Sequence, residues 1–82
     1  MGSALHVGNL SQAITDRDLS KMFGEYGVVE SAVIIRDTAT GASKRVASVV
    51  MGNEEEAQTA INWLHLSQFE GRTISVTRVR TH

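Results

Sequence analysis

The stretch VVESAVIIRDTATGASKRVASVVM, residues 28–51, decides the fold of this chain. Its first part, Val28 to Arg36, is rich in the β-branched residues that favour strands. Val46 to Met51 is a second apolar run of strand length. Residues 37–43 between the two runs are polar and typical of turns. The stretch therefore predicts two strands joined by a loop in the middle of the chain.

Helices are predicted on both sides of these strands. On the N-terminal side, Thr15 followed by Asp18 is typical of a helix start, in which each side chain bonds the other residue's backbone. The next apolar residues form one helical stripe, Leu19, Met22, Phe23 and Tyr26. We expect Gly27 to close this helix in a left-handed conformation. On the C-terminal side, Asn53 is expected to cap a helix with the stripe Ala57, Ala60, Ile61 and Leu64.

Two further runs predict the first and last strands. Residues 5–7 form a short apolar run closed by a turn, and residues 73–79 alternate apolar with polar side chains. Right-handed crossovers arrange the order βαββαβ as a four-stranded antiparallel sheet with the first and third strands at its centre. We therefore predict an α+β fold with both helices packed on one face, which leaves the other face open for a functional site.

Length and composition exclude several classes of protein. With 82 residues and 41% hydrophobic residues, the chain is expected to form one globular domain, residues 1–82. The lack of cysteine excludes a disulfide framework, a thiolate metal site and a cysteine nucleophile. No membrane-spanning run or signal peptide is visible, so we expect a cytoplasmic protein with no cofactor and no membrane partner. The net charge is −1, so nucleic-acid binding would depend on local charge placement.

Two segments resemble the ribonucleoprotein motifs of the RNA recognition motif (RRM) family. Residues 5–10, LHVGNL, are similar to the second motif, and residues 44–51, KRVASVVM, lie where the first motif should lie. The framework also resembles the family at residues 18–19, 23–27, 37–41, 57–64 and 71–72. The resemblance covers residues 4–80 and is closest to short single-domain bacterial RRM proteins. It implies a ferredoxin-like domain that binds RNA on the open face of its sheet.

The chain departs from the family at the positions that usually stack on RNA bases. Family members have aromatic residues where this chain has His6, Val46 and Ser48, and glycine where it has Arg45. Stacking on an aromatic ring is worth about 1–3 kcal/mol per base, so we expect weak binding of short single-stranded RNA. The resemblance and the basic charges together predict RNA contacts for His6, Asn9, Arg36, Lys44, Arg45, Val46, Ser48, Arg78 and Arg80.

The resemblance also assigns the two faces of the sheet, which periodicity alone leaves open because both faces are largely apolar. The residues that it places in the core are Val29, Ala32, Ile34, Ala47, Val49 and Met51. The residues that it leaves on the open face are His6, Val33, Ile35, Val46, Ser48 and Val50. An exposed apolar patch of this kind usually marks a contact site.

A protein-interaction module is the alternative function, in which another protein or a second copy of this chain covers the apolar part of the open face. Enzymes of the same topology fit less well. Acylphosphatase-like proteins need an arginine in the phosphate-binding loop after the first strand, and residues 8–11, GNLS, contain none. Copper-chaperone-like domains need paired cysteines. We therefore expect a non-enzymatic domain.

Overall fold

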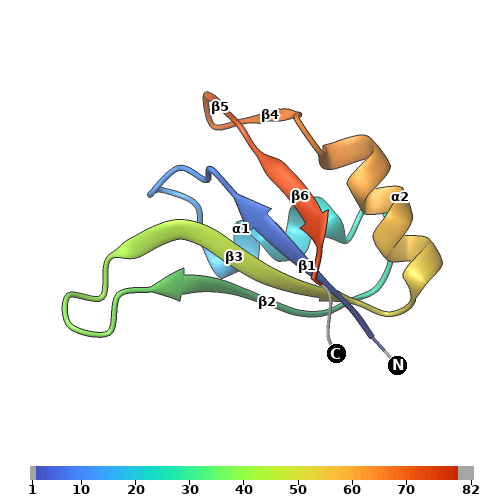
Figure 1. The fold of residues 1–82 in the computed structure, drawn as a ribbon, viewed down its shortest axis with the longest axis horizontal. Coiled ribbons are helices and arrows are strands. Elements are labelled where there is room, and N and C mark those ends of the chain that lie inside the picture. Colours follow the sequence, from blue (N-terminus) through green and yellow to red (C-terminus); the bar gives the residue numbers. More distant parts are fainter. Residues whose placement is uncertain (1, 80–82) are drawn as a thin grey trace.

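A computed structural model describes residues 2–79 of the chain. The elements in chain order are β1 (Ser3–Gly8), α1 (Asp16–Phe23), β2 (Val29–Arg36), β3 (Ser43–Met51), α2 (Glu54–Leu64), β4 (Gln68–Phe69), β5 (Arg72–Thr73) and β6 (Ser75–Arg78). Four strands form one antiparallel sheet in the order β2-β3-β1-β6, and β4 and β5 form a separate small hairpin (Figure 1). The predicted fold, with β1 and β3 at the centre of the sheet, is confirmed.

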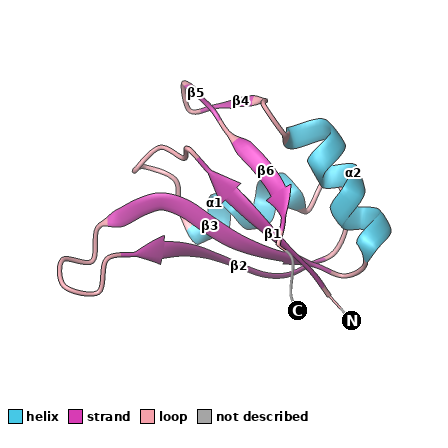
Figure 2. Cartoon of the chain, in the orientation of Figure 1, coloured by secondary structure: helices cyan, strands magenta, loops and turns pink. Residues whose placement is uncertain are grey.

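Both helices pack on the same face of the sheet and enclose the core. Helix α1 contacts β2, and α2 contacts β6, β1 and β3, so the two helices divide this face between them (Figure 2). Ala47, Val49 and Met51 of β3 are fully buried beneath them. Ile34 of β2 is buried too, which confirms the predicted assignment of the two faces. Within residues 2–79, no helix is long and apolar enough to cross a membrane.

The two helix starts follow from local side-chain chemistry. At α1 the Asp18 amide donates to Oγ1 of Thr15 at 3.2 Å, and the Thr15 amide donates to Oδ2 of Asp18 at 3.0 Å. At α2 the Glu56 amide donates to Oδ1 of Asn53 at 2.9 Å. Each bond satisfies a backbone donor that has no partner inside the helix. Both predicted caps are therefore confirmed.

The predicted end of α1 is wrong. The helix ends at Phe23, and the next residue, Gly24, has a right-handed conformation with φ −62°. Among the described glycines, left-handed backbone occurs at Gly41 and Gly71 and not at Gly27. The reason for a glycine at position 27 is space: a Cβ atom there would lie 2.5 Å from Oε2 of Glu56. That same oxygen accepts a hydrogen bond from the Val28 amide at 2.9 Å and so joins the α1–β2 connection to α2.

Side chains also bond the outer backbone of the two edge strands. Oδ1 of Asp16 accepts a hydrogen bond from the Ile34 amide of β2 at 2.8 Å. Nδ1 of His65 accepts one from the Val76 amide of β6 at 3.0 Å. Beside β6, the Ile74 amide donates to the carbonyl of Ser67 at 2.9 Å. These bonds satisfy backbone donors that the sheet itself leaves unpaired.

Candidate nucleic-acid interface

The face of the sheet that the helices leave uncovered, called the open face below, has His6 at its centre. Strand pairing places His6 of β1 opposite Ser48 of β3 on one side and Thr77 of β6 on the other. Ser48 in turn pairs with Val33 of β2. One row of side chains therefore crosses all four strands, and the exposed imidazole of His6 is its single ring.

The open face has two chemically different halves. Over β2 and β3 lies an aliphatic half, which consists of Val33, Ile35, Val46 and Val50. Val33 is 52% exposed and Ile35 40% exposed, which are large fractions for aliphatic side chains. The residues around His6 form a hydroxyl half, Ser48, Ser75 and Thr77. The face therefore offers apolar contact on one side of His6 and hydrogen-bonding groups next to it.

Gly8 keeps space free beside the His6 ring. It pairs with Ser75 of β6, and a Cβ atom at position 8 would lie 2.8 Å from Oγ of Ser75. The same atom would lie 3.6 Å from Cε1 of His6. A larger residue at position 8 would therefore displace the Ser75 hydroxyl, and its Cβ would be in ordinary van der Waals contact with the imidazole. The glycine thus keeps the side of the ring uncovered.

Basic side chains gather at one end of the open face. The pairing of β2 with β3 shifts register between Ile35 and Arg36, so Lys44 and Arg45 form a bulge. Arg45 has a left-handed backbone with φ 63°, and its carbonyl accepts the Leu10 amide at 2.9 Å. Lys44 and Arg45 are exposed, as is Arg36 on the facing strand. Arg36 lies two residues after the buried Ile34, so its side chain is on the helical side of β2, where Nη1 donates to the carbonyl of Gly41 at 3.5 Å. The basic end therefore supplies two cations, Lys44 and Arg45, beside the aliphatic half.

Asn9 lies near the same end, but its side chain is already bonded within the fold. Its Nδ2 donates to the carbonyl of Thr73 at 2.6 Å. Its Oδ1 accepts a hydrogen bond from Nη2 of Arg72 at 2.6 Å, and its carbonyl accepts one from Nε of Arg72 at 3.2 Å. This contact, called the Asn9–Arg72 clasp below, joins the exit of β1 to the β4–β5 hairpin. The role of Arg72 could not be predicted from the sequence, because no local pattern links residues so far apart.

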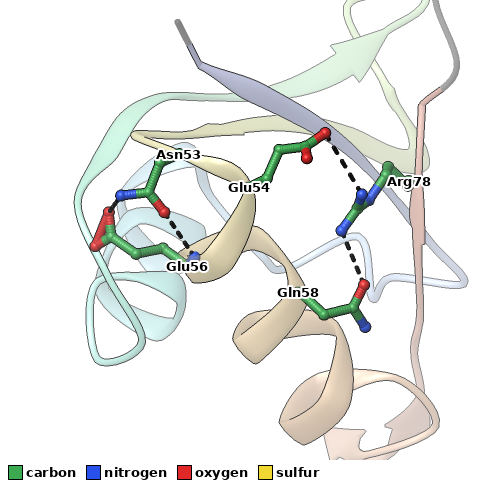
Figure 3. Close-up of polar contacts among 5 residues, drawn as sticks. All are labelled: Asn53, Glu54, Glu56, Gln58 and Arg78. Atoms are coloured by element: carbon green, nitrogen blue, oxygen red, sulfur yellow. Dashed lines mark hydrogen bonds and ion pairs between the residues drawn. The ribbon is translucent and has the colours of Figure 1, made fainter.

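Arg78 lies away from the open face. It pairs with the buried Leu5 of β1, so its side chain is on the face that the helices cover. There Nη1 lies 3.6 Å from Oε1 of Glu54, and Nη2 donates to Oε1 of Gln58 at 2.8 Å. Figure 3 shows both contacts reaching α2, away from the capping pair Asn53 and Glu56. Arg80, the last predicted contact residue, lies outside the described residues.

The geometry therefore groups five of the nine predicted residues. His6, Val46 and Ser48 lie on the open face, and Lys44 and Arg45 lie in the bulge at its basic end.

The sequence model of the RNA recognition motif matches residues 5–75, which is most of the chain. The chain belongs to the RNA recognition motif family. The putative RNA-binding protein RbpF of Nostoc sp. is 36% identical over 77 residues, which are 94% of this chain and 73% of RbpF. The chloroplastic RNA-binding protein CP33 of Arabidopsis thaliana is 43% identical over 72 residues, which are 88% of this chain and 22% of CP33. A structure of an Sxl-lethal protein/RNA complex matches with a TM-score of 0.92 and 30% identity, covering 100% of this chain and 49% of that chain.

The chain is similar both to a short RRM protein, RbpF, and to an RRM domain within a longer protein, CP33. RbpF is a short cyanobacterial protein, which confirms the resemblance to short bacterial members. The chain spans less than a quarter of the length of CP33. The sequence predicts base stacking at His6, Val46 and Ser48, and His6 has the one ring among these three residues.

Proposed function

We propose that this RRM domain binds short single-stranded RNA on its open face, with low affinity. The observation that carries the proposal is the exposed His6 at the centre of that face, with the basic end beside it. RbpF is named a putative RNA-binding protein, and the matched Sxl-lethal protein was solved with RNA, which supports the same ligand class.

Each part of the open face has a role in this binding. The imidazole of His6 stacks on one base, while Ser48 and Thr77 hydrogen-bond to its edge. The aliphatic half contacts ribose and the face of a neighbouring base. Lys44 and Arg45 neutralise phosphates as the RNA strand leaves the sheet. Single strands are preferred over duplex because stacking requires a base that is free of its own pair.

Low affinity follows from the number of rings on the open face. Each aromatic platform is worth about 1–3 kcal/mol per base, and two of the three family platforms are replaced by Val46 and Ser48. The loss is roughly 2–6 kcal/mol in total, or roughly one to four powers of ten in Kd. The basic end offsets part of this loss at low salt.

A salt titration tests the proposal. Fluorescence anisotropy with a labelled ten-nucleotide RNA should give binding that weakens with a slope of about −2 to −4 in log K against log salt, because few phosphates are neutralised. The same RNA annealed to its complement should bind more weakly. Affinity that ignores salt, or no binding of single strands at low salt, would contradict the proposal.

A matched pair of variants locates the site. Lys44→Ala removes one cation from the basic end, and Arg17→Ala removes one cation from the exposed surface of α1. We expect Lys44→Ala to weaken RNA binding and to reduce the salt slope by about 1, while Arg17→Ala changes neither. Equal effects of the two variants would mean that binding reflects overall charge and not the open face.

Self-association through the aliphatic half is the second candidate function. Val33 and Ile35 are 52% and 40% exposed, and burial of such surface against a second copy would be favourable. Light scattering after size-exclusion chromatography, over a range of protein concentrations, tests this candidate. A dimer that dissociates when RNA is added would show that RNA and the second copy bind the same open face.

Both candidate functions are non-enzymatic, and the cytoplasmic location stays a prediction.

A further inference from the structure

An open groove on the helical side of the molecule is separate from the proposed RNA site. Its volume is about 390 Å³, and its lining residues are Asp18, Lys21, Met22, Glu25, Phe69 and Glu70. It runs between α1 and the turn of the β4–β5 hairpin. The volume lies within the range of sites that hold small ligands or large side chains.

The groove has an apolar floor. Met22 and Phe69 are half-buried, and both pack against the core from outside. Packing against the core therefore fixes the position of both side chains, including the parts that remain exposed. An aromatic ring fixed in this way offers a face on which a planar group can stack.

The rim of the groove is acidic. Three lining residues are carboxylates, Asp18, Glu25 and Glu70, and one is a cation, Lys21. Within residues 2–79, the ion pair present joins Arg78 to Glu54, so Glu25 and Glu70 lack a charged partner there. Arg17 lines a neighbouring hollow on α1 and not this groove. The groove therefore carries an excess of negative charge over an apolar floor, which disfavours RNA as its occupant.

We propose that this groove docks an arginine side chain of a protein partner. The guanidinium is planar and weakly hydrated, so it stacks on the ring of Phe69 while its N–H groups bond the carboxylates of Glu25 and Glu70. The aliphatic stem of the arginine packs on Met22. A lysine forms only the charge contact, because its compact ammonium is strongly hydrated and cannot stack in the same way.

The position of the groove makes this docking compatible with RNA binding. Helix α1 lies on the covered face of the sheet, whereas His6 and the basic end belong to the open face. A partner held through α1 therefore leaves the proposed RNA site accessible, and the domain can hold both ligands together.

NMR titration of the ¹⁵N-labelled protein tests the proposal without RNA. The probe is a capped peptide of alternating glycine and arginine, compared with peptides in which lysine or glutamine replaces arginine. We expect the arginine peptide to shift the amide signals of α1 and of the β4–β5 turn, the lysine peptide to bind more weakly, and the glutamine peptide to cause no shift.

Two matched double variants test whether peptide binding depends on the carboxylates of the groove or on the overall negative charge of the protein. Glu25→Gln with Glu70→Gln should weaken the arginine peptide about fivefold, the loss expected for two exposed ion pairs. Glu30→Gln with Glu55→Gln removes two exposed carboxylates elsewhere and should leave the affinity unchanged. The amide spectrum of each variant reports whether it is folded. Equal losses in both variants, equal binding of arginine and lysine peptides, or shifts centred on the acidic start of α2 would overturn the proposal.

Discussion

Arg45 holds a backbone conformation that glycine adopts freely and arginine does not. Its φ of 63° lies in the left-handed region, which costs an L-residue with a side chain about 1–2 kcal/mol. The conformation is imposed by the bulge in β3, where the Arg45 carbonyl accepts the Leu10 amide. RRM proteins commonly have glycine here. The domain thus keeps a strained, exposed residue in the bulge of β3.

We predict that Arg45→Gly is more stable than Arg45→Ala by about 1 kcal/mol in free energy of unfolding. Both variants remove the same guanidinium, but alanine keeps the strain and glycine relieves it; the greater freedom of glycine in the unfolded chain offsets part of the gain. Urea denaturation monitored by circular dichroism measures the difference. RNA affinity should fall equally in the two variants, because they lose the same charge. An alanine variant as stable as the glycine variant would argue against strain at this position.

Val46 and Ser48 lie on the open face, so larger side chains there meet solvent or ligand and not the core. We predict that Val46→Phe combined with Ser48→Phe strengthens RNA binding, since each ring adds about 1–3 kcal/mol of stacking. Anisotropy titration gives the affinity and light scattering gives the mass of the same sample. The single variant Thr59→Phe is the control, because it adds a ring to the exposed surface of α2, on the side of the sheet away from the open face, and should leave RNA affinity unchanged.

Three results of this double substitution lead to different conclusions. Tighter RNA binding at unchanged mass supports the proposed function. A dimer that becomes monomeric while RNA binding stays undetectable supports self-association through the aliphatic half, since two bulky rings would disrupt a close-packed contact. Loss of folding would contradict the register of β3, in which Ala47 and Val49 are the buried neighbours.

The Asn9–Arg72 clasp holds one element against another. It fixes the β4–β5 hairpin, which has only two residues in each strand, to the end of β1. A pairing this short is not stable without outside contacts. The positions of Phe69 and Glu70, and therefore one wall of the groove beside α1, depend on this attachment.

A double-mutant cycle measures the clasp. Asn9→Gly keeps the left-handed backbone of Asn9, whose φ is 60°, and removes the side-chain bonds, while Arg72→Met removes the guanidinium and keeps much of the stem. We predict a coupling energy of about 0.5–1 kcal/mol from urea unfolding, reduced by the exposure of the pair. Asn9→Gly should also leave RNA affinity unchanged if its side chain serves the clasp. A large loss of affinity at normal stability would instead support the predicted RNA contact.

The start of a helix could be predicted from the sequence because the residues that form its cap are close together in the chain. The caps at Thr15 and Asn53 depend on side chains three residues from their targets, and both were found. The end of α1 was misplaced because Gly27 is required by Glu56, a residue from another element. The contacts that Asn9 makes with Arg72, and Arg78 with Glu54 and Gln58, could not be predicted for the same reason, since these residues become neighbours only after folding. The RNA contacts of Asn9 and Arg78 stay predictions.

At the scale of the whole molecule, the sheet separates two surfaces of different charge. The basic end lies beside the open face, whereas the acidic first turn of α2 and the acidic groove lie on the helical side. Although the net charge is −1, one side of the sheet is basic and suits RNA, and the other side is acidic and suits a basic protein partner. The sequence could indicate which side of the sheet is open through the family resemblance, because the alternation of β3 is apolar on both faces. The side on which Arg78 falls could not be predicted, because it depends on strand register.

The hydrogen bonds from Asp16 to β2 and from His65 to β6 also affect how copies of the domain behave toward one another. Outermost strands with free backbone donors are templates on which a second chain can add a strand, and repeated addition leads to fibrils. Here a side chain already occupies one such donor on each outermost strand, at Ile34 and at Val76. Growth of the sheet from molecule to molecule would first have to break these bonds. Strand addition at either edge thus has a cost in hydrogen bonds that ligand binding on the open face does not have.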